Sequence, residues 1–77
     1  MAINLDEANS FEDALDLEVE VQADKRLPRN VRRLYLEYLG QLRLMLHARE
    51  EEATAVEDGA EATMDEIYDE LPAEWQW

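Results

Sequence analysis

Residue types on which catalysis and metal binding depend are scarce in this chain. There is no cysteine, and the chain holds one histidine, His47, and one serine, Ser10. The lack of cysteine excludes a disulfide framework and a thiolate metal site, and it fits a reducing cytosolic setting. Ser10 stands where a helix cap is expected, so no serine or cysteine nucleophile can pair with the histidine. We therefore expect a protein that is not an enzyme and that binds no cofactor.

Long apolar runs and glycine-rich segments are also missing. No run of about eighteen apolar residues occurs, and the first ten residues lack the basic and apolar regions of a signal peptide. The two glycines, Gly40 and Gly59, are too far apart to form a phosphate-binding loop. We expect a cytoplasmic protein with no membrane contact.

Carboxylates are plentiful, but their spacing does not favour a metal site. Glu50, Glu51 and Glu52 are consecutive, so they would point in different directions around a helix. The Glu57-Asp58-Gly59 segment lacks the alternate-residue oxygen ligands of a calcium-binding loop. The sequence predicts a solvated acidic surface without metal ligands.

Charge is sorted into three blocks along the chain. Residues 1–24 carry eight carboxylates and no lysine or arginine, residues 25–49 carry all seven basic residues and one glutamate, and residues 50–77 carry eleven carboxylates. The net charge of −13 repels nucleic acid and attracts basic proteins. We expect the arginines to neutralise carboxylates of this chain or of a partner; direct contact with nucleic acid is the less favoured alternative.

The length of 77 residues predicts a single small domain. A chain this short buries only about 60% of the surface that its unfolded form exposes, so a partner or a second copy would add useful core. We divide residues 1–77 into an acidic arm (1–24), a basic-to-amphipathic central helix (25–56), and an acidic C-terminal helix with an aromatic tail (60–77).

The acidic arm gives two signals. Ser10 and Asp13 resemble a capping box, which predicts the start of a short helix. From Leu15 to Gln22 apolar and polar residues alternate strictly, and this period favours an extended strand over a continued helix. The fold class expected is mainly α, with one possible β-strand in the N-terminal arm.

The central helix is the clearest element. Apolar residues recur at helical spacing after Pro28, which suits a first helical turn, and a stop is expected at Glu57-Asp58-Gly59. Only a narrow polar strip that includes Arg33, Gly40 and His47 is left, so the helix should be wrapped by other segments or by a second chain. The residues expected to form the core or a self-association surface are Val31, Leu34, Tyr35, Tyr38, Leu39, Leu42, Met45 and Leu46.

The C-terminal part has its own helix signal and an aromatic end. Thr63 and Glu66 form a capping-box pattern, and Pro72 should end the helix. Trp75 and Trp77 either fold back to complete a small core or remain out as anchors for a partner pocket. The expected partner-binding residues are Asp65, Glu66, Tyr68, Asp69, Glu70, Trp75 and Trp77.

These patterns predict a small acidic protein-binding module. It would dock on a basic surface of a larger protein and inhibit or modulate it, and carboxylates on a helical surface can imitate the phosphates of a nucleic acid. The excess acid could instead serve only to keep a small helical protein soluble. An alternative function is that of a helical accessory or structural subunit in a homo- or hetero-oligomer.

Overall fold

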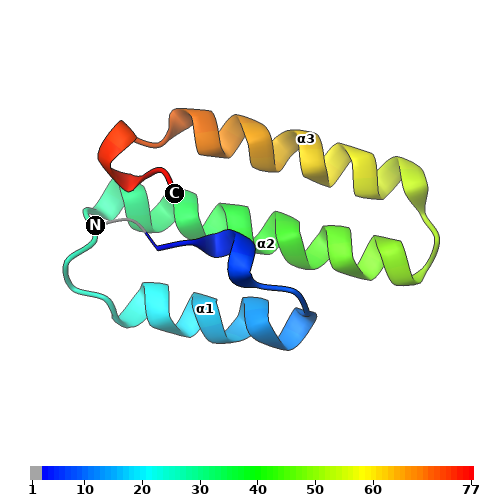
Figure 1. Cartoon of the computed structure of the whole chain (residues 1–77), viewed down its shortest axis with the longest axis horizontal. Helices are drawn as coiled ribbons and strands as arrows, with labels where there is room; N and C mark the ends of the chain where they lie inside the picture. Colours follow the sequence, from blue (N-terminus) through cyan, green and yellow to red (C-terminus); the bar gives the residue numbers. More distant parts are fainter. Residues whose placement is uncertain (1–2) are drawn as a thin grey trace.

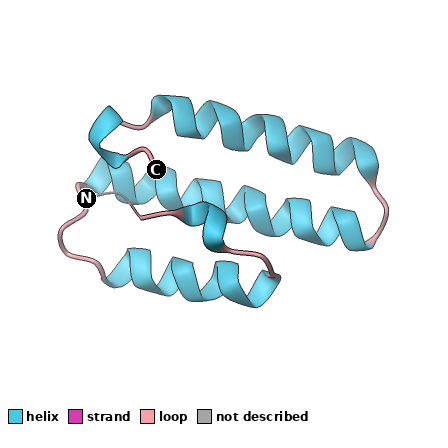
Figure 2. Ribbon diagram, viewed as in Figure 1, coloured by secondary structure: helices cyan, strands magenta, loops and turns pink. Residues whose placement is uncertain are grey.

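The computed structural model describes residues 3–77, and the chain forms a layer of three helices with the longest in the middle (Figures 1 and 2). The helices α1, α2 and α3 run antiparallel to their neighbours in the chain, and a short 3-10 helix stands near each end. The layer measures 37 × 23 × 17 Å. The elements are η1 (Leu5–Glu7), α1 (Phe11–Ala23), α2 (Arg29–Glu50), α3 (Thr54–Glu70) and η2 (Ala73–Trp75).

Helix α1 begins where the sequence predicted. The Ser10 hydroxyl accepts the backbone N–H of Asp13 at 3.2 Å, and the Asp13 carboxylate accepts the N–H of Asn9 at 3.3 Å. One N–H of the first turn that the helix itself cannot satisfy is thereby bonded, together with the N–H of the residue before the cap.

The expected strand over residues 15–22 is wrong, because α1 continues to Ala23 and residues 3–77 contain no strand. A lone strand would leave its backbone groups without partners, whereas a helix bonds them internally. The alternating apolar residues are consequently spread around α1. Val21 is buried and Leu17 half-buried, while Leu15 and Val19 are exposed by 38% and 66%. The mainly α class holds.

Helix α2 supplies the centre of the core. Its apolar stripe is buried between α1 and α3, with only Leu46 half-buried. Leu5 of η1 and Leu71 after α3 are buried against it from the two ends of the chain. The buried residues of the stripe are Val31, Leu34, Tyr35, Tyr38, Leu39, Leu42 and Met45.

The expected end of the central helix near Gly59 is wrong. Helix α2 ends at Glu50, and α3 begins at Thr54 and continues through Gly59. Glu52 adopts a left-handed conformation (φ 58°), and Ala53 N–H donates to the Ala48 carbonyl at 2.8 Å. This geometry is a Schellman motif in which glutamate occupies the position usually taken by glycine.

The expected capping box at Thr63 is also wrong. Thr63 lies inside α3, and its hydroxyl donates to the Gly59 carbonyl at 2.9 Å. Because α3 starts ten residues earlier than that box implied, its acidic surface is longer than the sequence indicated.

Two arginines of α2 form hydrogen bonds and an ion pair with α1. Arg32 donates to the carbonyls of Val21 and Asp24 at the end of α1. Arg43 forms an ion pair with Glu18 at 2.9 Å, and its guanidinium lies 5.7 Å from the centre of the Phe11 ring. Within residues 3–77, no helix combines the length and apolar character that crossing a bilayer requires.

Candidate protein-binding site

The aromatic tail folds back onto the helices. The Trp77 ring meets the rings of Tyr35, Tyr38 and Tyr68 edge-on, at centroid distances of 5.9, 4.9 and 4.8 Å. The Tyr35 hydroxyl donates to the Trp75 carbonyl and the Tyr68 hydroxyl to the Trp77 carbonyl, each at 2.6 Å. Trp75 and Trp77 are half-buried, so in this structure they complete the core margin instead of extending into solvent.

The N-terminal segment closes the same side of α2 as the tail. Its Asp6 carboxylate accepts the hydroxyl of Tyr38 at 2.9 Å. Burial, the hydrogen bond to Asp6 and the charge of Asp65 raise the pKa of Tyr38 well above its usual value. Tyr38 therefore stays protonated and holds Asp6 in place.

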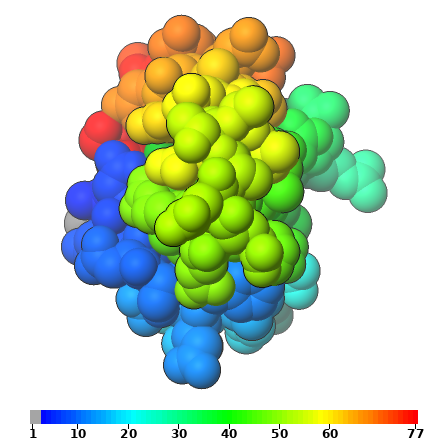
Figure 3. All heavy atoms as spheres, turned by 90° about the vertical axis from the view of Figure 1, so that its right-hand side faces the viewer, coloured from blue at the N-terminus to red at the C-terminus, as the bar shows by residue number. Residues whose placement is uncertain are grey.

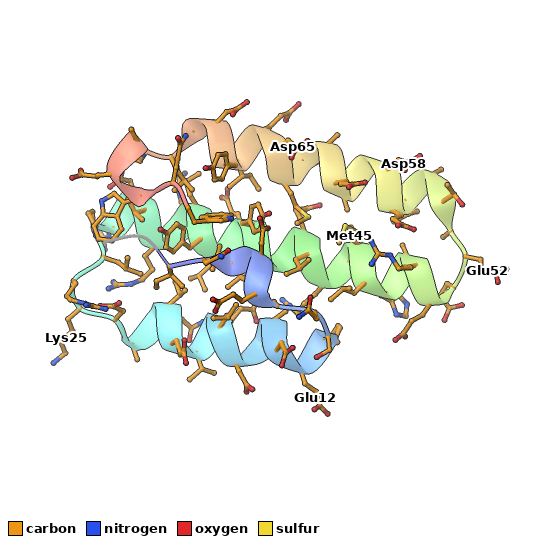
Figure 4. The ribbon with its side chains drawn as sticks, viewed as in Figure 1. Glu12, Lys25, Met45, Glu52, Asp58 and Asp65 are labelled. Atoms are coloured by element: carbon orange, nitrogen blue, oxygen red, sulfur yellow. The ribbon has the colours of Figure 1, made fainter. Side chains whose placement is uncertain are left out.

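Between η1 and α3 lies a groove of about 400 Å³. Its floor is apolar, with Leu42 and Met45 from α2 and Met64 from α3. We call this the acidic groove because three carboxylates line it, those of Asp6, Glu61 and Asp65. Figure 4 labels two of the lining residues, Asp65 on α3 and Met45 on α2. The further lining residues are Ala8, Asn9, Tyr38, Leu46 and Arg49.

The single arginine of the groove does not neutralise these carboxylates. Arg49 donates to Glu57 at 3.1 Å, at the start of α3. Among residues 3–77 the only other ion pairs are those of Arg26 with Asp24 and Arg43 with Glu18. The Arg26 pair lowers the pKa of Asp24 to about 2, by a hydrogen bond to the carboxylate. The acidic groove is therefore left with negative charge.

The outward side of α3 extends this charge along the molecule. Six of its carboxylates are exposed, and none has an ion-pair partner in the part of the chain that the structure describes. They are Asp58, Glu61, Asp65, Glu66, Asp69 and Glu70. We call this set the α3 acidic face.

The structure separates the residues expected to bind a partner into two groups. The four carboxylates Asp65, Glu66, Asp69 and Glu70 lie exposed on α3, whereas Tyr68 is half-buried beneath the tail. Sequence reasoning missed Asp6 and Glu61. Glu61 lies one turn before Asp65 and could have been found by helical spacing. Asp6 reaches the groove only because buried Leu5 anchors η1, and no local pattern encodes that contact.

In residues 3–77, no three histidine, cysteine, aspartate or glutamate side chains converge closely enough to hold a metal ion. The carboxylates are spread along α3 and across the groove, and this spacing suits several separate contacts with a large charged surface. Comparison with protein-family models finds no match, and no curated protein or solved structure shows significant similarity to the chain.

Proposed function

We propose that this protein is a non-enzymatic binding module that docks its α3 acidic face and acidic groove on a basic surface of a larger protein. The observation that carries the proposal is the row of exposed carboxylates on α3 without cationic partners in residues 3–77. Exposed charges of one sign raise the association rate with an oppositely charged surface and select against acidic partners.

The density of charge on α3 matches a basic surface that binds nucleic acid. The six carboxylates between Asp58 and Glu70 fall on about 18 Å of helix, or one per about 3 Å. One strand of duplex DNA carries a phosphate about every 3.4 Å along its axis. Docking would therefore block or modulate a nucleic-acid-handling protein by occupying its phosphate-binding surface.

The acidic groove adds a site for one basic side chain. A lysine or arginine stem would lie on Leu42, Met45 and Met64, and its charged end would reach the carboxylates of Asp6 or Asp65. The hydrogen bond from Tyr38 keeps Asp6 oriented before the partner arrives. Such preorganisation lowers the entropy lost on binding.

The test is partner capture followed by charge variants. Proteins retained from a lysate by the immobilised chain would be identified by mass spectrometry, and the affinity of each purified partner would be measured against salt concentration. We expect basic partners whose binding weakens as the Debye length falls below about 8 Å. A variant with Asp58, Asp65 and Asp69 changed to Asn should associate more slowly, because long-range attraction acts before contact.

The matched control changes three exposed carboxylates of α1, Glu12, Asp16 and Glu20, to their amides. Both variants lose three negative charges, so a general charge effect would slow them equally. Equal slowing, salt-independent affinity, or firm binding of duplex DNA by the isolated chain would overturn the proposal.

A further inference from the structure

Within residues 3–77, no segment covers one side of α2. The N-terminal segment and the tail both cross the side that carries Tyr35, Tyr38 and Leu42 (Figure 1). In Figure 3 these blue and red segments lie on one side of the molecule, and the first turns of α2, in teal-green, project on the other. We call the uncovered surface the open face. Its residues recur every three or four positions along α2 and are Arg29, Arg33, Leu36, Gly40, Leu44 and His47.

The open face is apolar at its centre. Leu44 is 43% exposed, and Leu36 is half-buried. The neighbouring helices add apolar edges. Phe11 of α1 lies beneath Arg43, next to the open face. Val56 of α3 comes nine residues before Asp65, which places the two side chains about 180° apart around the helix. Asp65 lines the groove on the covered side, so Val56 lies toward the open face. Both side chains are nearly half exposed.

Gly40 stands at the middle of this face, four residues from Leu36 and four from Leu44. A Cβ at Gly40 would have no neighbour within 4 Å, so the packing of the single chain does not require glycine there. Glycine inside a helix is destabilising relative to alanine, and its use elsewhere is to let another backbone approach closely.

The unpaired charges at the two ends of α2 are opposite, because Arg49 in the last turn is already paired with Glu57 of α3. The first turn has no acidic residue and no side-chain cap, and Arg29 and Arg33 are exposed without carboxylate partners in residues 3–77. At the other end Glu50 and Glu51 are exposed and also unpaired within those residues. A second α2 laid antiparallel on the first would bring the basic end of each helix to the acidic end of the other. A parallel arrangement would put like charges together.

We propose that the open face binds the open face of a second copy of this chain, in an antiparallel pair with its two-fold axis at Gly40. In this register Leu36 faces Leu44 of the second copy, and Arg29 faces Glu51 of the second copy. The helix of 22 residues gives a contact about 33 Å long. Such an isologous contact uses one surface twice and closes at two copies.

A hollow at the basic end fits the same register. It has a volume of about 730 Å³ and is lined by Arg29, Asn30, Arg32, Arg33 and Leu36. In this register the five lining positions face Glu51, Glu50, Ala48, His47 and Leu44 of the second copy, in that order. The pair leaves both acidic grooves on the outside, so this inference does not depend on the proposed function.

The first experiment measures mass by sedimentation equilibrium, without any partner protein. The wild type should be a dimer at micromolar concentration, and Leu44→Glu should weaken dimerisation at least about tenfold by burying an unpaired charge. Val19→Glu is the control. Val19 lies two residues, about 200°, from buried Val21 and so faces away from α2. A monomeric wild type, or a dimer that Leu44→Glu leaves intact, would overturn the proposal.

Two further variants test the register. Arg29→Glu and Glu51→Arg should each weaken the dimer, and the double variant should recover most of the loss. Gly40→Leu adds apolar surface, so it would strengthen a non-specific association, but it should weaken the proposed pair by holding the backbones apart. No recovery in the double variant, or a tighter dimer with Gly40→Leu, would refute this arrangement.

Discussion

The two sides of α2 differ in how far other segments of the chain bury them. On the covered side Tyr35 and Tyr38 are buried, and their hydroxyl groups are bonded to Trp75 and Asp6. On the open face Leu44 is 43% exposed, and a Cβ at Gly40 would have no neighbour within 4 Å. One surface of α2 is therefore covered by other segments of the same chain, and the other surface is exposed and available to a second molecule.

The difference follows from the lengths of the elements. Helix α2 has 22 residues, α1 has 13 and α3 has 17, and the rest of residues 3–77 consists of two short loops and the two short end segments. Both ends lie on one side, because Ile3 and Asp6 bond to the hydroxyl groups of Tyr35 and Tyr38, and Trp77 packs on the same two tyrosines. Residues 3–77 therefore cover α2 on three sides and leave the fourth uncovered.

The largest expected difference in stability comes from placing a charge on the buried side of α2 in one variant and on its open face in another. Leu39 is fully buried, so Leu39→Asp should lower the free energy of unfolding by about 3 kcal/mol or more and abolish the fold. Leu44→Asp, on the open face, should change the stability of the monomer by less than about 0.5 kcal/mol. Circular dichroism with urea at low protein concentration would measure both. Equal loss of helix in the two variants would show that the open face is part of the core.

A smaller effect is expected from the tail that covers α2. Trp77→Ala removes three edge-on aromatic contacts of about 0.5–1.5 kcal/mol each beyond area burial, so we expect a loss of about 2 kcal/mol. In a domain this small that loss lowers the melting temperature by roughly 8–16 °C. Glu74→Ala, an exposed change in η2, is the control. An unchanged melting temperature in both variants would mean that the tail contributes nothing to the covered side.

The smallest effect is a gain. Gly40→Ala should raise the stability of the monomer by about 0.5–1 kcal/mol, because alanine favours helix and its Cβ has free space on the open face. Chemical denaturation at a concentration below that of any self-association would show it. A loss of stability would place Gly40 in a contact within the chain.

The sequence predicted those features that depend on neighbours along the chain. The spacing of apolar residues from Val31 to Met45 identified α2 and its buried side, and Ser10 marked the start of α1. The alternation from Leu15 to Val21 suggested a strand, and this failed because no second strand was available to pair with it. The turn at Glu52 could not be recognised in the sequence, because a residue other than glycine adopts the left-handed conformation there.

The candidate site was only half predictable for a related reason. Exposed carboxylates on α3 can be recognised from composition, so Asp65 and Asp69 were expected. The groove requires that η1, 32 residues before Tyr38, lie beside α3, and only the folded chain determines that approach. The packing of Trp77 on three tyrosines also depends on the folded chain. The sequence did not decide between a tail that folds back and a tail that stays free.

Both tryptophans of the chain lie in the tail, one at the end of η2 and one at residue 77. Tryptophan fluorescence, excited selectively at the red edge of the protein absorption, therefore reports whether the tail is packed on the helices. It does not report on the ends of α1 and α3 near Glu12 and Glu52. Far-ultraviolet ellipticity instead reports the three helices together. Two melting curves recorded on one sample, one from each signal, would thus separate the closing of the covered side from the formation of the helical layer.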